Sequence, residues 1–345
     1  MTKHPNTKIT ILAIESSCDD TSAAVIRDGA VLSNRIANQT VHSDYGGVIP
    51  ELASRMHDKN IVPVVNQALI DADVSKSDLD AIAFTKGPGL LGSLLVGVNF
   101  AKSLALGLDI PIVEVNHMEA HVMAHFAEAP YPEFPFICLT VSGGHTQLVL
   151  VNDHNNMEVI GSTLDDAAGE AFDKTGKLLG LPYPAGPIID KYAQMGKPLY
   201  TFAKPSVGEF DFSFSGLKTS ILYSLQKRVK EDPNWVSDNM YDICASVQSS
   251  IVTILLEKLE HAVEKLNVKS AAIAGGVSAN SALRNGLLAL GKKKHWHTYI
   301  PAFNYCTDNA AMIGISGYYH YLAGHLSNQS VSPEPRLTIT ASSKN

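Results

Sequence analysis

Residues 9–36 read ITILAIESSCDDTSAAVIRDGAVLSNRI, and this stretch decides the fold class of the chain. Two apolar, β-rich runs, Ile9 to Ile14 and Thr21 to Ile26, flank a polar corner, and Asp28-Gly29 leads into a third run. An Asp-Gly pair between such runs is a strong hairpin signal, because glycine supplies the positive φ that the tight turn needs. The chain is therefore predicted to open with three strands.

The same pattern begins again in residues 134–160, which read FPFICLTVSGGHTQLVLVNDHNNMEVI. Helical and strand patterns alternate after each opening, so each half is predicted to read βββαβαβα. A duplicated α/β chain of this order is the plan of the actin-like and sugar-kinase-like fold, whose ligands sit in a cleft between two lobes. A single doubly wound sheet is the alternative, but two separate hairpin openings argue against it.

The duplication predicts where the lobes begin and end. Residues 1–130 are expected to form the first lobe and residues 131–325 the second, with an irregular insertion at 182–232. The last residues, 326–345, are expected to form a polar tail.

Composition indicates a globular protein of a reducing compartment. The 345 residues are 45% hydrophobic and 18% charged, and the four cysteines stand far apart without a C-x-x-C pair. This pattern argues against a disulfide framework or a thiolate zinc site. The start, Met1 to Asn6, is polar, and the apolar run from Leu90 to Leu106 carries Asn99 and Lys102. We therefore expect neither a signal peptide nor a membrane span, but a buried core helix in a cytoplasmic protein.

The net charge of −7 bears on nucleic-acid binding. A chain that binds RNA alone by neutralising phosphates is usually basic, so this one would need local patches or a partner. Lys292 to Lys294 form the densest basic run, which is more typical of a solvated polar turn.

Three polar or glycine-rich corners follow buried strands, where backbone N–H groups of a tight turn can face an anion. They are Glu15 to Thr21, Ser142 to Thr146 and Gly275 to Asn280. None matches a P-loop or a dinucleotide fingerprint. Each corner alone is more typical of a plain turn, but recurrence at equivalent places in both halves favours a phosphate-binding role.

A metal site is predicted from His117 and His121, which stand four residues apart on one helix face and can chelate one ion. These histidines open the last strand–helix step of the first half, and Asp308 opens the corresponding step of the second. In a pseudo-twofold duplicate those helix starts would face each other across the cleft. Two histidines and one carboxylate leave open positions, an arrangement associated with non-haem iron(II). We expect one divalent metal per chain, Fe²⁺, with Zn²⁺ as the alternative.

The histidine pair is not the zinc-protease motif. In H-E-x-x-H the glutamate base directly follows the first histidine. Here Glu119 is the middle residue and is rotated about 200° around the helix from His117, by the 100° step per residue. It should point away from the ion, and His125 is expected to be a polar or packing residue.

Several motifs together closely resemble the bacterial TsaD family, the tRNA N6-adenosine threonylcarbamoyltransferases once labelled glycoproteases. They span residues 11 to about 317 and are ESSCDDT (15–21), KGPGL (86–90), NHMEAH (116–121), VSGGHT (141–146), FSFSGLKT (212–219), GGVSAN (275–280) and CTDN (306–309). The family often ends in a basic, proline-rich segment, whereas here Ser332 to Arg336 read SPEPR, which leaves the role of the tail open.

The resemblance implies transfer of a threonylcarbamoyl group from threonylcarbamoyl-AMP to N6 of the adenosine 3′ to the anticodon, in tRNAs reading codons that begin with A. It implies His117, His121 and Asp308 as metal ligands. It also implies a degenerate paralogue subunit and an ATPase subunit as partners. The residues that it implies for the acyl-adenylate are Thr140, Val141, Ser142, Gly143, Gly144, Asp173, Gly186, Asp190 and Asn280.

Two other classes of function compete with this one. An ATP-dependent small-molecule kinase of the same fold would be expected to show a catalytic aspartate in a D-x-G-type loop, and none is evident in residues 15–21. A non-catalytic scaffold of the same fold would not need His117, His121 and Asp308.

Overall fold

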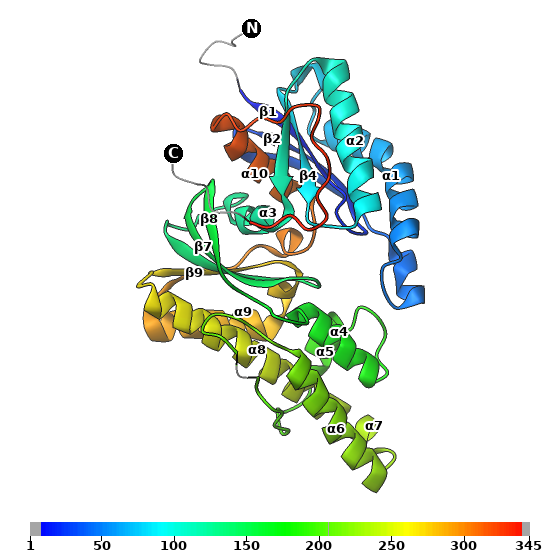
Figure 1. Cartoon of the computed structure of the whole chain (residues 1–345), viewed down its shortest axis with the longest axis vertical. Helices are drawn as coiled ribbons and strands as arrows, with labels where there is room; N and C mark the ends of the chain where they lie inside the picture. Colours follow the sequence, from blue (N-terminus) through cyan, green and yellow to red (C-terminus); the bar gives the residue numbers. More distant parts are fainter. Residues whose placement is uncertain (1–7, 206, 340–345) are drawn as a thin grey trace. The chain divides into compact units, whose positions relative to one another are not determined.

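The computed structural model describes residues 8–205 and 207–339. The polar start, Met1 to Asn6, and the end of the tail, 340–345, lie outside the described residues. Contacts divide the chain into two compact units, shown with their elements in Figure 1. The first comprises Met1–Tyr131, His154–Asn156 and Ala302–Asn345, and the second comprises Pro132–Asp153 and Met157–Pro301.

The first unit is built on a five-stranded sheet in the order β3-β2-β1-β4-β5. Its strands are β1 (Thr10–Glu15), β2 (Thr21–Arg27), β3 (Ala30–Ala37), β4 (Ala81–Gly87) and β5 (Ile112–Asn116). β1, β2 and β3 pair antiparallel, whereas β1, β4 and β5 run parallel. Asp28 and Gly29 take positive φ angles of 51° and 80°, as the predicted hairpin requires.

Helices cover both faces of this sheet. They are α1 (Pro50–Asp71), α2 (Leu91–Leu108), α3 (His117–Met123) and α10 (Ala310–Leu322), with 3-10 turns η1 (Thr40–Tyr45), η2 (Lys76–Asp78), η3 (Ala124–Phe126) and η5 (Phe303–Tyr305). Successive strand residues point to opposite faces. Leu12 and Ile14 of β1 therefore join a core with α1 and α2, while Ala13 faces α10.

Helix α10 departs from the predicted division, which counted residues up to 325 with the second lobe. It packs on β1, β2 and β4 of the first unit. A Cβ at Gly314 would collide with Ile26, and one at Gly317 would collide with Ala83, so the two glycines allow a close approach to the sheet. The physical reason is thus a helix surface of small residues matched to an alanine-lined sheet face.

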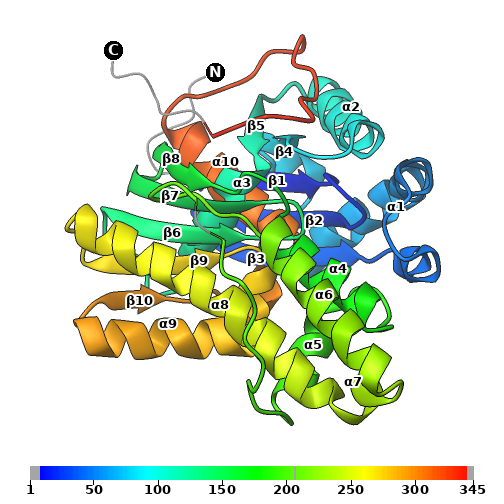
Figure 2. The ribbon, with the colours of Figure 1, turned by 60° about the horizontal axis from the view of Figure 1, so that its bottom comes forward.

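The second unit repeats the same topology, with the sheet order β10-β9-β6-β7-β8. Its strands are β6 (Phe136–Val141), β7 (Thr146–Asp153), β8 (Asn156–Ser162), β9 (Ser270–Ala274) and β10 (His297–Tyr299). Its helices are α4 (Ala168–Leu178), α5 (Gly186–Ala193), α6 (Ser215–Glu231), α7 (Trp235–Asp238), α8 (Met240–Lys265), η4 (Gly276–Ala279) and α9 (Ser281–Lys294). Helices α8 and α9 run side by side (Figure 2). The predicted duplication is confirmed.

The segment 182–232 is not irregular as predicted, because it contains α5 and α6. Helix α5 begins beside Pro187, a residue that fits the first turn of a helix. Helix α6 buries Leu217, Ile221 and Leu225 at a spacing of four residues, a pattern that indicates an amphipathic helix. Helix α5 was missed because Pro182, Pro184 and Pro187 surround its start.

Helix α2 has the length and apolar composition of a membrane span, with a mean hydropathy of 1.5. In the structure this helix packs against the first unit, where its Leu94, Val98, Ala101 and Ala105 are buried. The helix was expected to be a buried core helix, and the structure shows that only one of its faces is buried. On the other face Leu91 and Leu106 are 52% and 71% exposed.

Candidate metal centre and phosphate-binding corner

Helix α3 carries the histidine pair directly after strand β5. The side chain of Asn116 caps the helix by accepting hydrogen bonds from the N–H groups of Met118 and Glu119. His117 and His121 are buried on the same helix face, with ring centroids 4.7 Å apart. A short, capped helix at the end of a buried strand thus fixes two imidazoles in one place.

Asp308 reaches the same place from the segment before α10. Its Oδ1 lies 3.4 Å from His117 Nε2 and 3.2 Å from His121 Nε2. The next residues are held by the sheet, because the N–H of Ala310 donates to Ser22 Oγ at 2.8 Å. Asp308 and the histidines belong to the same compact unit, so the expected arrangement across two lobes is replaced by one within the first unit.

These three side chains fit a metal ion. One ligand atom from each can be chosen so that all lie within 4.8 Å of one another. His121 Nδ1 is buried without a hydrogen bond, and the only polar atom near His121 Nε2 among the described contacts is Asp308 Oδ1, at 3.2 Å. A buried polar atom without a partner is costly unless something else satisfies it. Two imidazole nitrogens and a carboxylate oxygen that converge on one point form a donor set for a divalent cation.

Glu15 and Ser17 complete the surroundings of His117, and sequence reasoning selected neither of them as a residue that supports a metal ligand. Glu15 Oε2 lies 3.0 Å from His117 Nδ1, and Ser17 Oγ lies 3.2 Å from the same nitrogen. Thr85 donates a hydrogen bond of 2.6 Å to Glu15 Oε2. A carboxylate on Nδ1 fixes the tautomer that leaves Nε2 free for a metal. The available signal was Glu15 itself, a carboxylate at the end of an apolar strand.

The charges of this cluster are strongly coupled. Burial opposes the charged form of His117, but the carboxylates of Asp308 and Glu15 raise its pKa well above the usual value. Burial opposes ionisation of Asp308, but the nearby His117 and His121 hold its pKa well below the usual range. Burial raises the pKa of Glu15, but the nearby His117 lowers it, and the net effect is a lowered pKa. A positive charge is therefore favoured between the two carboxylates.

The coupling predicts how pH affects the metal-free protein. His117, with its raised pKa, stabilises the fold fully below its unfolded value of about 6.5 and loses this effect as pH rises through the folded value. The lowered pKa values of Asp308 and Glu15 give stability that is present above about 4 and lost on acidification. In the presence of a chelator that removes metal ions, His117→Gln should therefore lower the urea concentration at the midpoint of unfolding more at about pH 5.5 than at about pH 8.5. An equal or larger difference at the higher pH would contradict this electrostatic picture.

Glu119 and His125, which were not expected to be metal ligands, lie outside the candidate ligand set. Glu119 Oε2 lies 3.7 Å from His320 Nε2, away from the three candidate ligands. His125 is buried in η3. Neither belongs to the converging donor set.

In the second unit, residues Thr140 to Gly144 end strand β6 and form the turn that precedes β7. The N–H of Ser142 donates to His145 O at 2.8 Å, and the N–H of Gly169, at the start of α4, donates to Ser142 O at 3.2 Å. A Cβ at Gly143 or Gly144 would meet no atom within 4 Å, and neither glycine has a positive φ in the described chain. These glycines leave open space, and they are not required by the backbone conformation of the turn.

Gly275, in the corner after β9, differs from them. Its φ is 85°, and a Cβ there would collide with the carbonyl oxygen of Val141. Glycine is required here because other residues seldom adopt such a φ and because any side chain would collide with Val141. It brings the corner after β9 against the end of β6.

The predicted ligand residues Asp173 and Asp190 each connect the start of a neighbouring helix by hydrogen bonds. Asp173 accepts from the N–H groups of Ala185 and Gly186 at 2.7 and 3.4 Å, which ties α4 to the start of α5. Burial raises the pKa of Asp173. Asp190 accepts from the N–H and Oγ of Ser281 at 3.1 and 2.6 Å. These contacts place the starts of α5 and α9 close to the helices that carry the two carboxylates.

Asn280 caps α9 by accepting from the N–H of Leu283 at 3.1 Å, and its Nδ2 donates to Gln248 Oε1 at 3.1 Å. Asp165, which sequence reasoning did not select, accepts from the N–H groups of Phe214 and Ser215 and from two serine hydroxyls. It thereby fixes the start of α6 within the FSFSGLKT motif. No local pattern identifies this carboxylate, because its partners lie about fifty residues away.

Comparisons with known proteins agree with this architecture. A profile of the family described as tRNA N6-adenosine threonylcarbamoyltransferase matches residues 30–315. A protein of that name from Christiangramia forsetii is 57% identical over 333 residues, which cover 95% of this chain and 98% of the relative. One from Cytophaga hutchinsonii is 55% identical over 332 residues, covering 96% and 97%. Neither the profile nor these relatives carries a kinase name.

A solved structure, HypF from T. kodakarensis, superposes with a TM-score of 0.59 at 14% identity, over 94% of this chain and 49% of that one. At this identity the likeness concerns the fold alone. The profile and the two relatives extend over nearly the whole chain, including both units and the candidate ligands. The chain therefore belongs to the tRNA N6-adenosine threonylcarbamoyltransferase family.

Proposed function

We infer that the chain transfers the threonylcarbamoyl group of threonylcarbamoyl-AMP to N6 of the adenosine 3′ to the anticodon, in tRNAs that read codons beginning with A. The observation that carries this inference is 57% identity to a relative of that name over 95% of the chain. The converging His117, His121 and Asp308 support it, because they provide a place for an electrophilic centre.

The chemistry sets what the protein has to supply. The N6 amine forms a bond to the carbamoyl carbon and loses a proton, while AMP departs with the electrons of the broken C–O bond. AMP is a good leaving group, but an exocyclic amine is a weak nucleophile. Catalysis therefore depends on holding the two reactants in register and on polarising the acyl group.

His117, His121 and Asp308 would hold one Fe²⁺ per chain, and Zn²⁺ is the competing ion. Three protein ligands leave coordination positions open, as in iron sites of two histidines and one carboxylate. When bound, the ion would act as a Lewis acid toward an oxygen of the donor. Glu15 would keep His117 in the tautomer that presents Nε2.

The second unit would hold the acyl-adenylate. The exposed backbone of Gly143 and Gly144 would approach its phosphate or acyl oxygen, since no side chain of a glycine blocks the N–H groups. Ser142 would shape the turn beside them, because its own N–H donates to His145 O. The residues proposed for the nucleoside part are Asp173, Gly186, Asp190 and Asn280. The hydrogen bonds of Asp173 to the start of α5 and of Asp190 to the start of α9 would hold this region in place.

Nucleoside mass spectrometry tests the proposed function. The purified chain is incubated with unmodified tRNA, threonine, bicarbonate, ATP, the enzyme that makes threonylcarbamoyl-AMP and the proposed paralogue and ATPase subunits, and the tRNA is then digested. Threonylcarbamoyladenosine should appear only when the chain is present. Its absence in the complete mixture, together with phosphorylation of a small molecule, would favour a kinase.

The partners proposed for this cytoplasmic reaction are a degenerate paralogue and an ATPase subunit. The exposed apolar side chains of α1 and α2 offer the paralogue a contact surface, with Val62, Ile70, Leu91 and Leu106 between 52% and 71% exposed. Ile70→Lys should abolish co-elution of the paralogue in gel filtration and leave the metal content unchanged. Unchanged co-elution would place the contact elsewhere.

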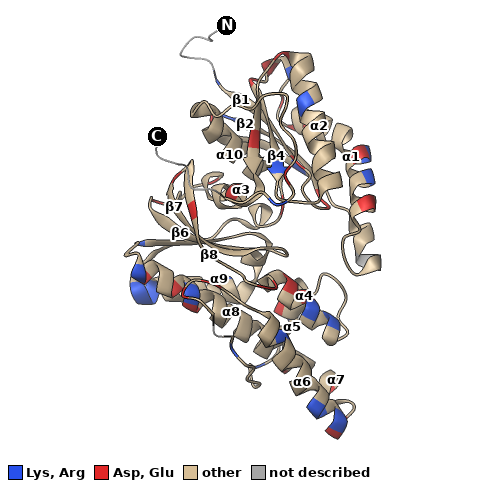
Figure 3. Cartoon of the chain, in the orientation of Figure 1, with Lys and Arg blue, Asp and Glu red and all other residues tan. Residues whose placement is uncertain are grey.

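The charge distribution predicts weak binding of tRNA by the isolated chain. Basic and acidic residues are interspersed in each unit, as Figure 3 shows, and the net charge is −7. Lys292, Lys293 and Lys294 occupy the last turn of α9, where Lys294 pairs with Glu260 and Glu264. Filter binding at several salt concentrations should give a shallow slope, with few phosphates neutralised, that steepens when partners are added. A steep slope for the isolated chain would contradict this expectation.

A further inference from the structure

The C-terminal strap, residues 326–338, crosses the first unit after α10. It begins beside the edge strand β5, where the N–H of Ser327 donates to Ile112 O at 2.9 Å. Ser327 Oγ accepts from the N–H of Glu114 at 3.1 Å. In the middle of the strap, Lys102 of α2 donates to Val331 O at 2.9 Å. The strap thus covers a sheet edge with specific hydrogen bonds.

The far end of the strap is attached to the KGPGL corner, residues 86–90. The N–H of Glu334 donates to Lys86 O at 2.8 Å, and the N–H of Gly89 donates to Pro335 O at 3.2 Å. A Cβ at Gly87 would overlap the carbonyl oxygen of Glu334, so this glycine allows the contact. Corner and strap therefore fit each other at the level of the backbone.

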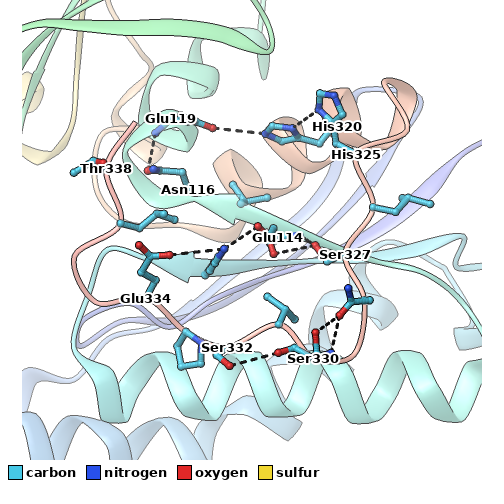
Figure 4. Close-up of a pocket in the computed structure, with 17 residues that line it drawn as sticks. Glu114, Asn116, Glu119, His320, His325, Ser327, Ser330, Ser332, Glu334 and Thr338 are labelled. Atoms are coloured by element: carbon cyan, nitrogen blue, oxygen red, sulfur yellow. Dashed lines mark hydrogen bonds and ion pairs between the residues drawn. The ribbon is translucent and has the colours of Figure 1, made fainter. Parts of the chain in front are cut away.

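A polar cavity of about 730 Å³ lies beneath the strap. Figure 4 shows Glu334, Glu114 and Ser327 on its walls, with Asn116, the cap of α3, also lining it. Lys86 bridges the walls, with its Nζ 2.9 Å from Glu114 Oε1 and 3.8 Å from Glu334 Oε2. A cavity lies below part of the strap, so the strap is held by its hydrogen bonds and by the packing of Val331 against the core of the first unit.

The same corner contacts the residues that orient His117. The N–H of Leu90 donates to Ser17 O at 2.7 Å, and a Cβ at Gly89 would collide with Ser17. Ser17 Oγ lies 3.2 Å from His117 Nδ1. A continuous series of contacts therefore leads from Glu334 and Pro335 through the corner and Ser17 to a candidate metal ligand.

We propose that the C-terminal strap is a positioning element for the metal centre: by clamping the 86–90 corner against Ser17, it holds His117 in the orientation that binds the ion. The proposal rests on the metal centre proposed above. The strap residues that make the contacts, Glu334 and Pro335, are not among the candidate metal ligands and act through the 86–90 corner. Loss of an outer-shell support commonly weakens metal binding about 10- to 100-fold.

The test is a double-variant cycle read by cobalt(II) binding, with the visible ligand-field bands of Co²⁺ as the signal. Four proteins are compared: the full chain, Gly87→Ala, a chain ending at Leu326, and the two changes combined. Gly87→Ala and the truncation should each raise the Kd for Co²⁺ about 10- to 100-fold. The combination should lose less than the sum of the two single changes, because the collision with the carbonyl oxygen of Glu334 is gone once the strap is removed and only the strain of the 159° φ at Gly87 remains.

Matched variants separate positioning from stability. Gly107→Ala adds a Cβ in open space and should leave the Kd unchanged. Glu334→Ala keeps the N–H that bonds to Lys86 O, whereas Glu334→Pro removes it, so only the proline should weaken Co²⁺ binding. This pair decides the question if the truncated chain does not fold.

Three results would overturn the proposal. The first is an unchanged Kd in the truncated chain or in Glu334→Pro, even if the metal-free protein melts at a lower temperature. The second is additive losses in the combined variant, which would mean that Gly87→Ala acts on the corner directly. The third is failure of the full chain to bind Co²⁺, which would remove the metal centre itself and with it the basis of this inference.

Discussion

Asp308→Ala should purify without its metal ion, whereas the wild-type chain retains one. In the structure Asp308 Oδ1 stands within 3.4 Å of both imidazole Nε2 atoms, so it supplies the only anionic ligand of the set. Two imidazoles alone hold a labile ion with little selectivity. We expect the affinity to fall by more than about 100-fold, the upper end of what loss of a supporting partner costs. Transfer to tRNA should fall with it.

Elemental analysis of protein purified without oxygen measures the occupancy. Asp58→Ala, which removes an exposed carboxylate of α1, is the matched control and should keep the ion. Full occupancy in Asp308→Ala would show that the aspartate is not a ligand. A loss of folded structure is detected separately by the circular dichroism of the metal-free proteins.

Gly143→Val should fold, keep its metal and lose most of its transfer activity. A Cβ at Gly143 would meet no protein atom within 4 Å, and the residue lacks a positive φ, so we expect valine to be compatible with the folded chain. A positive φ, which a glycine in a tight turn would suggest, is not found at Gly143, so backbone strain does not account for the expected loss. What remains is the steric block to a phosphate or acyl oxygen that approaches the Ser142–Gly144 backbone. Since one donor of this kind is typically worth about 10²–10³ in rate, a loss of this size is expected.

The control for this change is Gly107→Val, which also places its side chain in open space, at the end of α2. Single-turnover transfer with preformed threonylcarbamoyl-AMP is the measurement, because it isolates the acyl transfer from donor synthesis. Gly107→Val should transfer at the wild-type rate. A Gly143→Val protein with near wild-type rates would mean that the corner is only a turn.

Much of the fold could be read from the sequence because the signals are local. The hairpin at Asp28-Gly29 and the apolar runs of β1, β2 and β6 lie where they were predicted, within about two residues. Helix α6 was missed because its start depends on Asp165, about fifty residues away, and not on a neighbouring cap. Such a cap is invisible to a pattern of adjacent residues.

Part of the candidate metal site could also be predicted from local sequence, and part of it could not. His117 and His121 are four residues apart, and the helical period alone places such a pair on one face of a helix. That Glu15 supports His117 follows from the parallel strands β1, β4 and β5, which bring their ends to one edge of the sheet. No spacing in the sequence links residue 15 to residue 117.

By itself, the sequence determined the duplicated order of strands and helices, the pair of imidazoles on one helix face, and the family motifs. Each depends on residues close together in the chain, whose periodicity and turn chemistry act before any long-range contact. Only the tertiary structure decided that Asp308 joins the histidines within one unit, because Gly314 and Gly317 let α10 pack on the alanine face of the first sheet. It likewise decided that the tail reaches the 86–90 corner, because a backbone-to-backbone contact between Glu334 and Lys86 has no signature in either segment.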